Sequence, residues 1–203
     1  MRFGIDIDIT LVETEVEWWK WLHDYGNYYS YSDILREAQK EGGKLDYNLA
    51  KYFHDFQDKC ENDPHNFWKQ DNLYDQLSPL PDSVNVVKKL VDAGHEIVFI
   101  SYCQGNHMSS KVRWLKKHFP FVKMGVNGGF LHTKEKHLVD VDVMIDDRID
   151  NLLPFKDNVI KIYFGSIYQD KPFKRGEVDF ITSDDCNLGW KELESYFEEL
   201  EVI

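Results

Sequence analysis

The sequence predicts an α/β fold: a Rossmann-like, doubly wound and mostly parallel sheet, with a small helical segment inserted after the first strand. Three observations support this. Short apolar runs alternate with amphipathic helical patterns, the order that parallel sheets require. Two of these runs have the pattern of short buried strands and end abruptly in acidic pairs. A long stretch after the first run lacks a clear strand, and its apolar residues recur at helical spacing.

The expected elements follow from the hydrophobic pattern. Strands are expected at Arg2–Ile7, His95–Ser101, Phe121–Val126, Val141–Ile145, Val159–Phe164 and Val178–Thr182. Helices are expected at Asp82–Ala93, Ser109–Phe119 and Leu188–Leu200. Gly94 and Pro120 directly follow the first two helical patterns and are typical helix-ending residues. Strands and helices therefore alternate over most of the chain.

The stretch from Glu13 to Ser78 interrupts this alternation and is bounded by Pro79-Leu80-Pro81. We interpret residues 13–78 as a helical cap, and residues 1–12 and 79–203 as the core. The stretch holds 14 of the 30 aromatic residues of the chain. Most of these rings should form the core of a small helical subdomain. We expect such an insertion to lie over the end of the first strand as a lid.

Composition narrows the class of protein. The chain has 203 residues, 42% of them hydrophobic, which is enough for a globular core. A net charge of −12 argues against a broad surface for polymeric nucleic acid but not against a small nucleotide. No apolar run approaches a membrane span, and Met1–Gly4 leads straight into an acidic motif, which leaves no room for a signal peptide. Three scattered cysteines suggest a reducing, cytoplasmic setting.

The acidic pairs are the strongest functional signal. Asp6 and Asp8 follow the first apolar run, and Asp146 and Asp147 close a later one. In an α/β sheet, ligands bind outside the carboxyl ends of the strands. Four carboxylates gathered there would repel one another unless a cation lies among them. A hard divalent ion such as Mg²⁺ prefers these oxygen ligands and often shares them with a phosphate.

This pattern suits phosphoryl transfer to a carboxylate, which needs a nucleophile, an acid for the leaving alcohol, and donors for the phosphoryl oxygens. Ser101, at the end of a predicted strand, and either Lys134 or Lys136 supply such donors. An acidic pair after strand one also occurs in phosphoacceptor signalling receivers. There, however, the lysine would follow the later strands, whereas here it precedes the second acidic pair.

The order D-x-D-x-T, serine after a strand, lysine and acidic pair resembles the haloacid dehalogenase superfamily of phosphatases. The segments Phe99–Ser101, Val112–Leu115, His132–Lys136 and Met144–Arg148 are similar to those of 5′(3′)-deoxyribonucleotidases. In that family a threonine lies three residues before the catalytic lysine, and the acidic pair begins ten residues after it. Thr133, Lys136 and Asp146 have this spacing, and Lys134 does not.

The resemblance implies a role for each residue. Asp6 would be the nucleophile and Asp8 the general acid/base. Ser101 and Lys136 would bind phosphate, with Tyr102 as a further candidate. Mg²⁺ would lie among Asp6, the carbonyl of Asp8 and Asp146, and Asp147 would support these ligands from behind. Two departures stand out, since the family usually has glycine in place of Ile9 and small residues after Ser101.

The expected activity is Mg²⁺-dependent hydrolysis of a nucleoside monophosphate through an aspartyl-phosphate intermediate. One or two cap aromatics would stack on the base. The candidates are Trp18, Trp19, Tyr28 and Phe53. Two alternatives remain open: the same chemistry on another small phosphate ester, and a phosphate- or nucleotide-binding module without turnover. The sequence also leaves open whether the chain forms a homodimer.

Overall fold

The computed structural model describes residues 1–24, 36, 44–52, 64–104, 107–169 and 171–203. Its centre is a six-stranded sheet in the order β4-β3-β1-β5-β6-β8, with every pairing parallel. The strands are β1 Arg2–Ile5, β3 Glu96–Ser101, β4 Gly128–His132, β5 Val143–Asp146, β6 Ile160–Tyr163 and β8 Phe180–Ile181. The predicted α/β class is confirmed.

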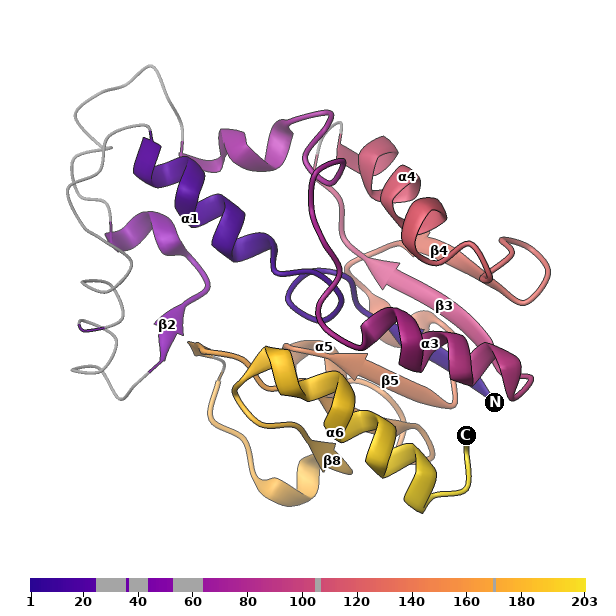
Figure 1. Cartoon of the computed structure of the whole chain (residues 1–203). Helices are drawn as coiled ribbons and strands as arrows, with labels where there is room; N and C mark the ends of the chain where they lie inside the picture. The colour runs from indigo at the N-terminus through magenta and orange to yellow at the C-terminus, as the bar shows by residue number, and fades with distance from the viewer. Residues whose placement is uncertain (25–35, 37–43, 53–63, 105–106, 170) are drawn as a thin grey trace.

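Helices cover both faces of this sheet. The helices are α3 Ser83–Asp92, α4 Met108–His118, α5 Ile149–Leu152 and α6 Cys186–Glu199. Buried residues of α3, α4 and α6 share one hydrophobic cluster with one face of the strands. Residues of α5 belong to a second cluster on the opposite face. Figure 1 shows α3 beside α6 in front of the sheet, and the two helices are in contact.

One predicted strand is wrong. Phe121–Val126 forms turns, and the edge strand β4 lies further along, at Gly128–His132. Gly125 has φ +79°, a conformation that glycine adopts readily, and it reverses the chain before β4. A side chain at Gly128 would place its Cβ 2.1 Å from the carbonyl oxygen of Ile97. The glycines that hid this strand from pattern analysis are therefore what allows it to pair closely with β3.

The stretch predicted as a cap contains α1 Thr14–Asp24, β2 Leu45–Asp46 and the 3₁₀ helices η1 Leu49–Tyr52 and η3 Pro64–Lys69. The expectation that it lacks strands is corrected by β2, which pairs in parallel with β7, Tyr168–Gln169. Its two ends adjoin, because Val12 bridges to Pro79 and Leu80 N donates to Leu11 O at 2.7 Å. The chain thus leaves the sheet and returns to it at one point, as an insertion does.

Two further 3₁₀ turns, η5 Lys136–Leu138 and η6 Arg175–Glu177, complete the described elements. Within the described ranges, every helix is too short or too polar to cross a bilayer.

Candidate active site

The loop after β1 turns back on itself directly behind Asp6. The amides of Leu11 and Val12 both donate to the carbonyl oxygen of Ile7, at 2.8 and 3.1 Å. Ile9 stands at the tip with φ +62° although it is β-branched and buried. This left-handed conformation costs an ordinary residue roughly 1–2 kcal/mol. The structure thus explains why glycine suits this position, and the tight turn persists with isoleucine in its place.

Asp6 is buried at the end of β1 and shares a lysine with Asp146. Lys136 Nζ lies 2.6 Å from Asp6 Oδ1 and 2.6 Å from Asp146 Oδ2. Burial raises the pKa of Asp6 to about 6, against the opposing effect of Lys136. Burial alone would lower the pKa of Lys136, but Asp146 and Asp6 raise it above its ordinary value. Lys136 is therefore a fixed ammonium group between two carboxylates.

Three buried carboxylates meet where β1 and β5 end. Asp6, Asp146 and Asp147 each offer an oxygen, and these atoms lie within 4.8 Å of one another. Asp146 is further fixed by Arg148 N and Asn151 Nδ2, which donate to its Oδ1 at 2.9 and 2.8 Å. Burial, and then the charge of Asp146, raise the pKa of Asp147 well above its ordinary value. This donor set fits a hard divalent cation, which would relieve the repulsion.

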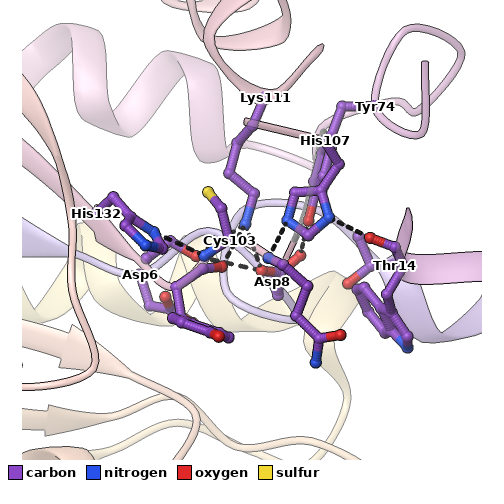
Figure 2. A network of polar contacts seen from close by, with 12 residues as sticks. Asp6, Asp8, Thr14, Tyr74, Cys103, His107, Lys111 and His132 are labelled. Atoms are coloured by element: carbon purple, nitrogen blue, oxygen red, sulfur yellow. Dashed lines mark hydrogen bonds and ion pairs between the residues drawn. The ribbon is translucent and has the colours of Figure 1, made fainter. Parts of the chain in front are cut away.

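Asp8 belongs to a second polar cluster, shown in Figure 2. Lys111 Nζ donates to Asp8 Oδ2 at 2.7 Å, Ser101 Oγ donates to the same oxygen at 3.2 Å, and Tyr74 Oη donates to Oδ1. Lys111 Nζ also donates to Ser101 Oγ at 2.9 Å. Burial alone would raise the pKa of Asp8, but Lys111 and then Tyr74 lower it below its ordinary value. Asp8 is therefore held as a carboxylate.

Lys111 is the main residue that sequence reasoning missed. It lies on α4 and is fully buried, as are its helix neighbours Ser110, Trp114 and Leu115. Val112 beside it has the apolar side chain that a hydrophobic pattern favours for the inward face, but it is only half-buried. The available signal was a lysine four residues before Leu115, the spacing that places two side chains on one helix face.

The two clusters open into one pocket of about 510 Å³. Its walls include all five residues expected to bind phosphate or act in catalysis, together with Asp147. The five are Asp6, Asp8, Ser101, Tyr102 and Lys136. Asp146 lies behind this wall, fully buried. Lys134 also lines the pocket, but it is exposed, and its Nζ lies over the Tyr102 ring, 4.3 Å from the centroid. The lysine between the carboxylates is therefore Lys136.

The segment after the first loop also contributes to the wall of the pocket. Its lining residues are Glu15, Trp18, Tyr47 and Trp68. Of the four aromatic candidates for base contact, Trp18 lines the pocket and Trp19 is not among the lining residues. Tyr28 and Phe53 lie outside the described residues. Sequence reasoning had not singled out Tyr47 or Trp68 for this role, because aromatic density alone does not say which ring faces the pocket.

Glu15 is a buried carboxyl group in this wall. Thr14 Oγ1 donates to its Oε2 at 3.1 Å, and no cation pairs with it among the described residues. Burial, and then the charge of Asp8, raise the pKa of Glu15 well above its ordinary value. Burial and the neighbouring Asp8 charge therefore both favour the protonated form of Glu15, which can donate a hydrogen bond.

A parallel α/β sheet with buried aspartates and lysines at the carboxyl ends of its strands suits a phosphoric monoester hydrolase, and the family that matches this chain is of that class. The chain matches the family described as 5′ nucleotidase, deoxy (pyrimidine), cytosolic type C, over residues 6–177, and it belongs to that family.

Two similar proteins match the chain over nearly its full length. The 5′(3′)-deoxyribonucleotidase of Bacillus subtilis (strain 168) is 26% identical over 194 residues, which covers 94% of this chain and 95% of the relative. The enzyme of the same name from Clostridium acetobutylicum is 27% identical over 197 residues, 97% of this chain and 94% of the relative. A solved haloacid dehalogenase-like hydrolase from Burkholderia xenovorans LB400 aligns with 80% of this chain and 83% of its own, at 17% identity and a TM-score of 0.46.

Proposed function

We propose that this protein hydrolyses deoxynucleoside monophosphates, with Mg²⁺ as its cofactor, through an aspartyl-phosphate intermediate on Asp6. The observation that carries the proposal is the pairing of two features in one pocket. A carboxylate held by a buried lysine lines the same pocket as Trp18, Tyr47 and Trp68. The first feature suits phosphoryl transfer, and the second suits a planar base. The names of the relatives support the same substrate class.

In the proposed reaction, an oxygen of Asp6 attacks phosphorus, and the bond from phosphorus to the nucleoside oxygen breaks. Asp8 gives a proton to that leaving oxygen. A water molecule, deprotonated by Asp8, then attacks the phosphorus of the aspartyl phosphate and releases inorganic phosphate. Lys136 offsets the charge that develops on the phosphoryl oxygens. Asp6, the carbonyl of Asp8 and Asp146 would hold Mg²⁺, with Asp147 beside them. The ion would add positive charge at the phosphoryl group.

Asp8 needs a proton for the first step, although its pKa is lowered in the substrate-free protein. Lys111 and Ser101 are the donors that share its Oδ2. An arriving phosphate dianion would compete for both donors and bring negative charge near Asp8. Each effect favours the protonated carboxyl. We therefore assign Lys111, with Ser101, to binding the phosphoryl group.

The test is a panel of 5′- and 3′-deoxynucleoside, ribonucleoside and small aliphatic monophosphates, assayed with Mg²⁺ and with a chelator. Preferential, Mg²⁺-dependent release of phosphate from deoxynucleotides is expected. Asp6→Asn should abolish turnover while the thermal midpoint stays close to that of the wild type, because the side chain keeps nearly the same shape. Faster hydrolysis of a small aliphatic ester would favour the broader phosphatase. Binding without turnover of any substrate would favour the non-catalytic module.

A further inference from the structure

His107 is a buried pocket residue that the proposed chemistry does not use. Only 2% of it is exposed, and it lines the pocket near Asp8 (Figure 2). Its Nδ1 lies 2.5 Å from the carbonyl oxygen of Trp68, and its Nε2 lies 3.2 Å from the amide nitrogen of Gln104. Both ring nitrogens are therefore engaged by backbone groups.

These two partners determine which ring nitrogen of His107 carries the proton. A carbonyl oxygen can only accept a hydrogen bond, and a backbone amide can only donate one. His107 satisfies both only when Nδ1 carries the proton and Nε2 keeps its lone pair. A doubly protonated ring would set Nε2–H against the amide hydrogen of Gln104. Burial, with Lys111 one turn along α4, lowers the pKa of His107 and supports the neutral form. The bond to the Trp68 carbonyl and the charge of Asp8 act on this pKa in the opposite direction, and His132 adds to the lowering.

The bonds of His107 join parts of the pocket that are distant in sequence. Trp68 comes from η3, within the inserted stretch, and Gln104 comes from the loop after Ser101. His107 also precedes α4, and its carbonyl oxygen accepts from Ser110 Oγ at 2.9 Å. One turn of the helix therefore separates the residue that holds Trp68 from Lys111, which contacts Asp8.

We propose that His107 is a positioning residue. Its neutral imidazole ring, protonated on Nδ1, holds Trp68 in the part of the pocket wall that contacts the leaving group. The Trp68 ring packs edge-on against Trp18, with centroids 5.5 Å apart, so displacement of Trp68 would disturb both rings of that wall. A planar leaving group would gain binding energy from contact with this wall, and a small aliphatic leaving group would not. Selectivity, more than the chemical step, should therefore depend on His107. The inference rests on the proposed function in taking the planar group to be a nucleoside.

The first test is a measurement on the wild-type protein, whose pocket is unaltered. The ¹⁵N chemical shifts of both ring nitrogens of His107 are measured at pH 7 in labelled wild-type protein, with the His107→Phe spectrum used for assignment. A protonated Nδ1 and an unprotonated Nε2 are expected. The opposite tautomer, or a doubly protonated ring, would overturn the assignment of the Trp68 bond.

The second test is a ratio of kcat/KM values, for a deoxynucleoside monophosphate over glycerol phosphate. His107→Phe should lower this ratio roughly tenfold through KM, because a lost neutral hydrogen bond is of that order. His107→Asn places an amide N–H near the Nδ1 position and should restore most of the ratio. His118→Phe, on the last turn of the same helix and outside the pocket, should leave the ratio unchanged.

An equal loss for both substrates in His107→Phe, or no recovery in His107→Asn, would reduce His107 to a structural residue. If the wild type hydrolyses no nucleotide, the proposed function fails independently. The same variants are then compared on naphthyl phosphate and glycerol phosphate, which differ in the same way at the Trp68 wall. An unchanged ratio there as well would contradict the inference itself.

Discussion

Single side chains set the charge of the candidate site. Lys136 lies between Asp6 and Asp146, each at 2.6 Å, whereas Lys134 lies outside over the Tyr102 ring. The two lysines are two residues apart but differ in exposure, because the chain enters η5 at Lys136 and turns that side chain inward. Local geometry thus separates two residues of identical chemistry.

Replacement of the buried lysine should be far more damaging than replacement of the exposed one. Lys136→Ala should lower kcat/KM by roughly a hundredfold or more, the order found for contacts to developing negative charge. Lys134→Ala is the matched control and should change kcat/KM little. Steady-state kinetics on one substrate give both values, and the reverse ranking would contradict the assignment of Lys136 as the phosphate ligand.

Lys111→Met should reverse the pH response of Asp8. In the wild type, Lys111 and Tyr74 lower the pKa of Asp8 below 3.8. Such a group stabilises the fold above its unfolded pKa, and this stabilisation is lost as pH falls through the folded pKa. Without Lys111, burial dominates and the pKa should rise above 3.8. The Asp8 carboxyl would then favour the folded state only when protonated, so its contribution would grow as pH falls.

NMR titration of the Asp8 carboxyl carbon in metal-free protein measures this directly. The midpoint for Lys111→Met should lie above that of the wild type. Lys117→Met, on the exposed side of the same helix, serves as the control. An unchanged midpoint would mean that Tyr74 and Ser101 alone hold the charge of Asp8.

At the scale of elements, the edge strand β4 depends on one of its two glycines. A Cβ at Gly128 would lie 2.1 Å from the backbone oxygen of Ile97 on β3, whereas a Cβ at Gly129 would meet nothing within 4 Å. The loop that follows β4 carries Lys134 and Lys136. Close pairing of β4 with β3 therefore helps to set the position of Lys136.

Gly128→Ala should lower the free energy of unfolding by at least about 2 kcal/mol, because the β3 backbone cannot give way as a flexible side chain would. Gly129→Ala should change it by less than about 1 kcal/mol, since the space is open and alanine is less flexible in the unfolded chain. Urea denaturation of both variants provides the comparison. Similar values would show that β4 can shift away from β3 without cost.

The whole molecule brings two distant parts of the chain to one pocket. The ends of β1, β3 and β5 carry the carboxylates and Ser101, and the inserted stretch carries Trp18, Tyr47 and Trp68. Because Leu80 N bonds to Leu11 O, this stretch starts and ends beside the loop that holds Asp8. The aromatic residues and the proposed phosphoryl site thereby line one pocket.

Removal of a ring from this wall should weaken nucleotide binding selectively. Trp18→Ala and Trp68→Ala should each raise KM for a deoxynucleoside monophosphate about tenfold, because stacking on one base contributes roughly 1–3 kcal/mol. KM for glycerol phosphate should change much less. Trp19→Ala, next to Trp18 but not among the pocket-lining residues, is the control. If neither variant separates the two substrates, the wall does not contact the base.

The sequence by itself predicted the α/β class, five of the six sheet strands, and Asp6, Asp8, Ser101 and Asp146 as polar residues at or just after strand ends. These predictions follow from local patterns, since apolar runs and the polar residues that end them are adjacent in the chain. The choice of Lys136 over Lys134 came from the spacing in the family that the chain resembles. The sequence did not predict β4, because the glycines that allow its close backbone approach to β3 lack the hydrophobic pattern of a strand. Only the tertiary structure decided that Lys111, Tyr74 and His107 join the site and that Trp68 faces it. Those contacts link residues from separate elements, and packing alone determines which side chain of a helix or an aromatic-rich segment turns toward the pocket.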